Sequence, residues 1–137
     1  MRAIDEIWII KSGGLTIFNL SKDANIDPLL VGGFFSAIET IAAQLGEKKL
    51  KVILLGNSKI TIYHGRDGLL FISRSSRKVK DKTIQKYLKI VETKFFERYG
   101  NILKEEISNS DLFKDFGNVI DAIFEDTPRK RAEKALW

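Results

Sequence analysis

Residues 50–73 read LKVILLGNSKITIYHGRDGLLFIS, a stretch in which three short apolar segments are separated by two turns that contain glycine. The segments are rich in β-branched and aromatic residues, which favour β-strands. Gly56-Asn57 and Gly65 to Gly68 are typical of tight turns. We therefore predict three consecutive strands, over residues 50–55, 59–64 and 69–73.

A hairpin is predicted near the N-terminus. Two strand-like segments, IWII at residues 7–10 and LTIFNL at residues 15–20, are separated by Ser12-Gly13-Gly14. A Gly-Gly turn between such segments indicates antiparallel pairing. Residues 7–10, 52–55 and 69–72 are apolar without alternation, so we expect these strands to be covered by helices on both faces.

The first of three predicted helices runs from Pro28 to Leu45, where apolar residues recur at spacings of three and four. Asp27 is suited to cap its N-terminus, and Gly46 follows in the place where helices end in a left-handed residue. Gly32-Gly33 lies inside this helix at a cost of about 1 kcal/mol per glycine relative to alanine. That cost indicates close approach of another backbone, either within this fold or from a partner.

Two further helices follow the last predicted strand. One begins at Asp81, which we expect to be its N-cap, and ends at Gly100. The other spans about residues 112–124, with Asp111 as its cap. The order is therefore β-β-α-β-β-β-α-α. We predict a mixed α/β (α+β) fold, in which a five-stranded antiparallel sheet carries the first helix on one face and the last two on the other.

The composition fits one small domain and sets limits on where it acts. The chain has 137 residues, of which 44% are hydrophobic, enough for a single core. Its first six residues include two acids and do not resemble a signal peptide. No apolar run approaches the roughly 20 residues that span a bilayer. We expect a cytoplasmic protein that is at most peripheral to membranes.

The residue types argue against an enzyme. The chain has no cysteine and a single histidine, His64, so it lacks a thiolate nucleophile and the usual multi-residue zinc site. Neither Gly13-Gly14 nor Gly32-Gly33 belongs to a phosphate-binding motif. We interpret His64 as structural, with an acid–base role as the alternative. We expect no catalytic residue, no cofactor and no bound metal.

Three phrases of the sequence, together with the order of elements, resemble the longin domain, a profilin-like and SNARE-like fold. IWIIKSGGLTIF at residues 7–18 is similar to the first hairpin of stand-alone longin-like proteins from archaea related to eukaryotes. DPLLVGGFFSAIETIAAQLG at residues 27–46 resembles their first helix. DGLLFISRS at residues 67–75, with a basic helix ending in FFERYGNIL, resembles their fifth strand and second helix. The resemblance implies a longin-like domain over residues 1–126, followed by a basic tail over residues 127–137.

The resemblance also implies a function. Longin domains and the similar roadblock domains are docking platforms in vesicle trafficking and in the regulation of small GTPases, and they commonly dimerise. On that basis the chain is expected to be a non-catalytic interaction module, an adaptor or scaffold. Its expected partner is a small GTPase or another longin- or roadblock-type chain, in a homo- or heterodimer.

One candidate partner surface lies on the first predicted helix. Phe34 and Phe35 are adjacent and therefore point about 100° apart. Both belong to the core in one interpretation. In the other, apolar residues of the helix form an exposed groove with the third predicted strand and hold a partner. The candidate residues are Val31, Phe34, Phe35, Ile38, Val52 and Leu54. The edge strands offer a second route, by strand addition.

A second candidate surface is basic. Between Arg74 and Lys89, Asp81 is the one acid among seven basic residues. A solvated face, an acidic partner and an anionic membrane surface all remain open. Nucleic acid ranks below them, because no aromatic residues for base stacking are interleaved and the body of the chain is not basic. The candidate residues are Arg74, Arg77, Lys78, Lys80 and Lys82.

Overall fold

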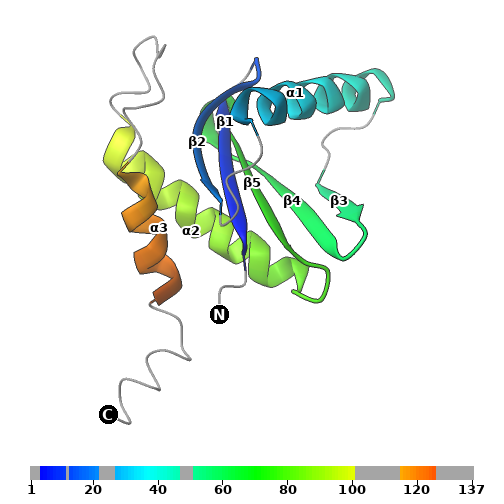
Figure 1. Ribbon diagram of the computed structural model, residues 1–137. Helices are drawn as coiled ribbons and strands as arrows, with labels where there is room; N and C mark the ends of the chain where they lie inside the picture. Colours follow the sequence, from blue (N-terminus) through cyan, green and yellow to red (C-terminus); the bar gives the residue numbers. More distant parts are fainter. Residues whose placement is uncertain (1–3, 12, 22–26, 47–50, 101–114, 126–137) are drawn as a thin grey trace, which may run out of the picture.

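The computed structural model describes residues 4–11, 13–21, 27–46, 51–100 and 115–125 (Figure 1). Its strands are β1 (Glu6–Lys11), β2 (Leu15–Ser21), β3 (Val52–Leu55), β4 (Ser58–His64) and β5 (Leu70–Ser76). Its helices are α1 (Pro28–Gln44), α2 (Asp81–Tyr99) and α3 (Phe116–Glu125), and a short 3-10 turn, η1 (Arg66–Gly68), joins β4 to β5. The predicted order of strands and α-helices is confirmed.

The five strands form one antiparallel sheet in the order β2-β1-β5-β4-β3. Figure 1 shows α1 on one face of the sheet and α2 with α3 on the other. The predicted fold class is therefore confirmed. The first strand in the sequence, β1, pairs with the last, β5, at the centre of the sheet.

Two hydrophobic cores lie on opposite faces of the sheet. Ile7 and Ile9 of β1 belong to the core under α2 and α3, whereas Trp8 and Ile10 belong to the core under α1. The unbroken apolar run of β1 thus has helices on both sides, as predicted. The core under α2 and α3 also holds a cluster of aromatic rings in mostly edge-to-face contact, made by Phe18, Phe71, Phe95, Tyr99 and Phe116.

Strand β3 departs from the prediction that it is covered on both faces. Leu54 and Leu55 are 55% and 51% exposed, and Val52 is only partly buried. The reason is topological: β3 is the edge strand of the sheet, so within the described chain it pairs with β4 alone, and of its residues Ile53 packs against the core under α1. The unbroken apolar sequence of β3 predicts a strand that is covered on both faces. Because β3 lies at the edge of the sheet, two of its leucines are instead exposed.

The caps of α1 are as predicted, and the cap of α2 is not. The Asp27 carboxylate accepts a hydrogen bond from the Leu29 N–H, and Gly46 has a φ of +80°. At α2 the N-cap is Lys80, which makes no side-chain capping bond. The Asp81 carboxylate instead contacts Lys59 Nζ at 2.6 Å. Lys59 is buried, and a buried ammonium requires a counter-charge, so the prediction that Asp81 caps the helix is wrong.

The start of α3 is held against the end of α2 by polar contacts. The Tyr99 hydroxyl and the Arg98 guanidinium both donate hydrogen bonds to the Asp115 carboxylate. These donors, Tyr99 first, hold the pKa of Asp115 below its ordinary value. The predicted cap Asp111, the first residues of the predicted third helix and the tail at residues 127–137 lie outside the described residues.

The two glycines inside α1 have different surroundings. A Cβ on Gly32 would lie 1.9 Å from the carbonyl oxygen of Gly14 in the β1–β2 turn, whereas a Cβ on Gly33 would meet nothing within 4 Å. The close approach of another backbone that was predicted from the glycine pair is therefore confirmed for Gly32, and that backbone is the β1–β2 turn of the same chain. It lets α1 sit directly on the turn.

We predict opposite effects of alanine at these two positions. Gly32→Ala should lower the free energy of unfolding by about 1–3 kcal/mol, because the methyl group collides with backbone rather than with a flexible side chain. Gly33→Ala should raise it by up to about 1 kcal/mol through helix propensity. Chemical denaturation followed by circular dichroism measures both, and a Gly32→Ala variant as stable as Gly33→Ala would contradict the close contact.

Candidate functional site

Helix α1 carries apolar side chains on its solvent side as well as on its sheet side. Leu30, Phe34, Ile41 and Leu45, which directly follows the helix, are each more than half exposed. At about 100° per residue these positions fall within about 60° of one another around the helix. We call them the outer stripe. No core residue of the described chain covers them, and a row of large exposed apolar side chains marks an interaction surface.

The residues predicted on this helix divide between core and surface. Val31 and Phe35 are buried in the core under α1, and Ile38 is partly buried. Phe34 is 51% exposed and packs edge-to-face on Phe35. Since adjacent helical residues point about 100° apart, only one of the two phenylalanines faces the sheet. The predicted groove of Val31, Phe34, Phe35, Ile38, Val52 and Leu54 is therefore not one surface.

Three outer-stripe residues were missed in the prediction. Leu30 precedes Phe34 by four positions, and Ile41 and Leu45 follow it by seven and eleven. This is a helical spacing, so the signal is present in the sequence. Ile41 and Leu45 fall within the single broad apolar face that the spacing predicts, whereas Leu30 lies outside that predicted face, and periodicity alone does not tell which part of a broad apolar face meets the sheet.

The edge strand β3 lies on the side of the sheet toward which α1 extends. Figure 1 shows α1 running from the β1–β2 hairpin, across the sheet, to end on the side of β3. Within the described chain β3 pairs only with β4, so its outer edge offers backbone N–H and C=O groups. Leu54 and Leu55 are exposed beside that edge. An edge strand with apolar side chains favours strand addition.

Arg74 does not belong with the exposed basic residues. Its guanidinium donates to Glu6 Oε1 through Nε at 3.0 Å and Nη2 at 2.6 Å, and through Nη1 to the Ser58 hydroxyl at 3.1 Å. Glu6 is buried, so this pairing compensates a charge inside the fold. We therefore remove Arg74 from the candidate anion-contact surface.

The other four predicted cations are exposed together. Arg77, Lys78, Lys80 and Lys82 occupy the connection from β5 into the first turn of α2, and all are exposed. Arg77 also donates to the Gly56 carbonyl oxygen at 3.1 Å. Asp81, the one acid of this segment, is paired with Lys59. The four therefore form a basic surface in which Asp81 is the one local acid and is already paired with Lys59, and we call this surface the basic corner.

A buried carboxylate on α2 has a structural rather than a chemical role. Glu92 is 7% exposed and accepts a hydrogen bond from the Arg66 backbone N–H at 2.8 Å and one from the Tyr63 hydroxyl at 3.4 Å. Burial, followed by the nearby Glu92 charge, raises the pKa of Tyr63. The Arg66 guanidinium lies 4.5 Å from the centre of the Phe96 ring. These contacts fix the η1 turn on α2.

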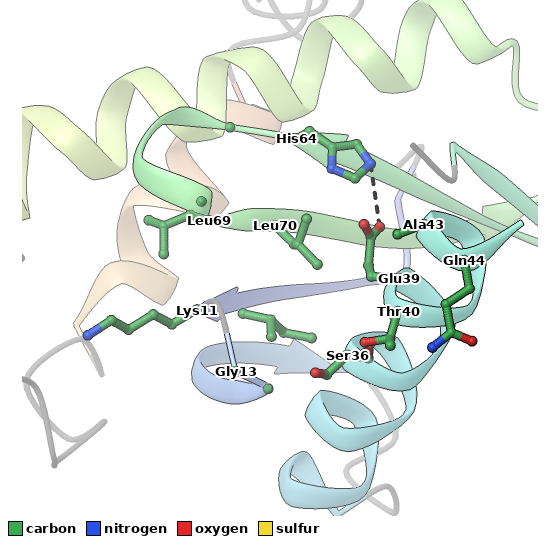
Figure 2. Close-up of a pocket in the computed structure, with 14 residues that line it drawn as sticks. Lys11, Gly13, Ser36, Glu39, Thr40, Ala43, Gln44, His64, Leu69 and Leu70 are labelled. Carbon is green, nitrogen blue, oxygen red and sulfur yellow. Dashed lines mark hydrogen bonds and ion pairs between the residues drawn. The ribbon is translucent and has the colours of Figure 1, made fainter. Parts of the chain in front are cut away.

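The structure contains a pocket between α1, the β1–β2 turn and the ends of β4 and β5. Its volume is about 770 Å³, and Figure 2 shows the residues that line it. His64 points into it from β4 and lies 3.5 Å, through Nε2, from Glu39 Oε1 of α1. Among the described residues no three histidine, cysteine or acidic side chains are grouped as a metal site would require.

Among the described residues, no helix combines the length and the apolar character that a bilayer-spanning segment requires.

Comparison with known proteins supports the fold. The sequence matches no protein-family model and no curated protein. A solved structure, MglB from Myxococcus xanthus, is similar over 72% of this chain and 85% of that chain, with a TM-score of 0.56 and 12% sequence identity. With a five-stranded antiparallel sheet between one helix and two, the described chain has a longin/roadblock-like fold.

Proposed function

We propose that this chain is a non-catalytic adaptor that pairs with a second copy of itself and regulates a small GTPase. Longin- and roadblock-type domains include regulators of small GTPases, and the fold similarity to MglB supports that setting over a vesicle-trafficking one. In this proposal residues 1–126 form the interaction domain, and the protein acts in the cytoplasm.

The outer stripe is the observation that carries the proposal. Four large apolar side chains are exposed along α1, and burying them against a partner is favourable by about 25 cal/mol per Å² of apolar surface. A second copy offers the same stripe, and a two-fold axis brings identical surfaces together. Pairing of β3 with its copy extends the sheet across the same axis. Helix packing and strand pairing then reinforce each other.

We predict that the purified chain is a dimer and that a charge on the outer stripe separates it. Wild-type protein should have about twice the 15.6 kDa chain mass in light scattering after size-exclusion chromatography. Phe34→Asp and Ile41→Asp should each give the mass of one chain, because burying a carboxylate between apolar faces is costly. Both residues are exposed, so the monomer should keep its fold.

Thr93→Asp is the matched control, since Thr93 is exposed on α2, on the opposite face of the sheet. It should leave the mass unchanged. A wild-type chain that is monomeric at high micromolar concentration overturns the dimer.

We predict state-dependent binding to a small GTPase. Purified small GTPases of the organism that encodes the chain are loaded with GDP or with a non-hydrolysable GTP analogue and titrated against the immobilised protein. One of them should bind at least about tenfold more tightly in one nucleotide state, which corresponds to about 1.4 kcal/mol. Equal binding in both states, or none with any GTPase, would contradict a regulatory role.

The basic corner supports a second proposal, peripheral contact with anionic membranes. Each exposed cation near an anionic lipid surface contributes about 1 kcal/mol. Lys78→Glu combined with Lys82→Glu should therefore reduce co-sedimentation with phosphatidylserine-containing vesicles at low salt by at least about tenfold. Lys94→Glu, a charge reversal in the second half of α2 at a lysine already near Glu97, should change it little. Equal sedimentation of wild type with neutral and anionic vesicles would exclude this proposal.

A further inference from the structure

The two halves of α1 carry different residues on the side that faces the sheet. Val31 and Phe35 of the first half are buried in the core. One turn later, on the same side of the helix, the sequence has Glu39 and then Ala43. These residues line the pocket rather than a core (Figure 2). Glu39 occupies a helix position where the preceding turn has a core residue. A glutamate at such a position indicates a binding site rather than a packed core.

The size and lining of the pocket suit a small organic group. Its volume of about 770 Å³ lies within the range of ligand sites, roughly 300–1,000 Å³. Ile10, Leu69 and Leu70 supply apolar surface, and α1 contributes polar side chains. Four glycines, which have no side chains to fill the space, also line the pocket. The polar residues that α1 contributes are Ser36, Glu39, Thr40 and Gln44.

The oppositely charged side chains of Glu39 and Lys11 both line the pocket. Glu39 Oε1 is buried, and no hydrogen bond to it is made by the described residues. His64 Nε2 is 3.5 Å away, which is an ion-pair distance when the imidazole is protonated but is too long for a good hydrogen bond. Figure 2 shows the Lys11 side chain leading away from the Glu39 carboxylate. A buried carboxylate oxygen without a hydrogen-bond donor is costly, so Glu39 Oε1 is suited to accept a hydrogen bond from a ligand.

We propose that this pocket binds a guanidinium or primary ammonium group carried on an aliphatic chain, as in arginine. The cationic head donates to Glu39, and the aliphatic stem lies on Leu69 and Leu70. The hydroxyl groups of Ser36 and Thr40 lie on the same wall and accept further hydrogen bonds from a guanidinium, which has five N–H donors. The site does not depend on the proposed dimer or GTPase, because it lies on the inner side of α1 and the outer stripe lies on the other side.

The test is an NMR titration of the ¹⁵N-labelled full chain. The probes are arginine amide, the peptide acetyl-Gly-Arg-Gly-amide, and norleucine amide blocked at its amine, which keeps an aliphatic stem without a charge. Both arginine probes should shift the amide signals of residues that line the pocket, Gly13, Gly14, Gly65 and Gly68 among them. The uncharged norleucine probe should not shift them.

Glu39→Gln should weaken arginine binding by about tenfold or more, since a charge-assisted hydrogen bond is replaced by a neutral one. Glu97→Gln removes the same charge from an exposed glutamate on α2 and should leave the affinity unchanged. Amide spectra that match wild type away from the pocket establish that both variants are folded.

The outcomes separate the sources of the cation. Binding of the peptide as tightly as arginine amide identifies an arginine side chain of a protein, whereas binding of arginine amide alone identifies a small molecule. Absence of pocket shifts at tens of millimolar, equal affinity in Glu39→Gln, or equal shifts with the norleucine probe would each overturn the proposal.

Discussion

The antiparallel pairing of β1 with β5 is the contact on which the rest of the structure depends. It aligns Trp8 with Ile72 and Ile9 with Phe71, and so sorts these side chains onto the two faces of the sheet. Trp8 and Ile72 enter the core under α1, whereas Ile9 and Phe71 enter the core under α2 and α3. A shift of one residue would exchange the two sets, so both cores and all three helices depend on this register.

The same pairing also organises the charges. It aligns Glu6 with Arg74, and their side chains form a hydrogen-bonded ion pair on the face of α1. On the other face, Lys59 of β4 is joined to Asp81 at the start of α2. These contacts pair one cation and one acid of the basic segment with buried partners. The membrane proposal rests on the exposed cations of the basic corner.

Helix α1 combines three different surfaces on 17 residues. Its first half is fixed by the contact of Gly32 with the β1–β2 turn and by Val31 and Phe35 in the core. Its second half stands over a pocket that holds Glu39 and His64. Its solvent side is the outer stripe. A partner on the stripe and a ligand in the pocket would therefore contact opposite sides of one helix, which places two binding events within reach of each other.

The elements, their order, the Gly-Gly turn, the ends of α1 and the need for helices on both faces of β1 and β5 could be predicted from the sequence, because local propensity and periodicity depend on short stretches of chain. Which apolar residues of α1 meet the sheet depended on the tertiary structure, because the apolar side chains of this helix cover a wider arc than the sheet can bury. It also decided that Asp81 and Arg74 serve buried partners, since Lys59 and Glu6 are distant in the chain. The uncovered leucines of β3 and the pairing of Glu39 with His64 likewise follow from strand order, which no local pattern encodes.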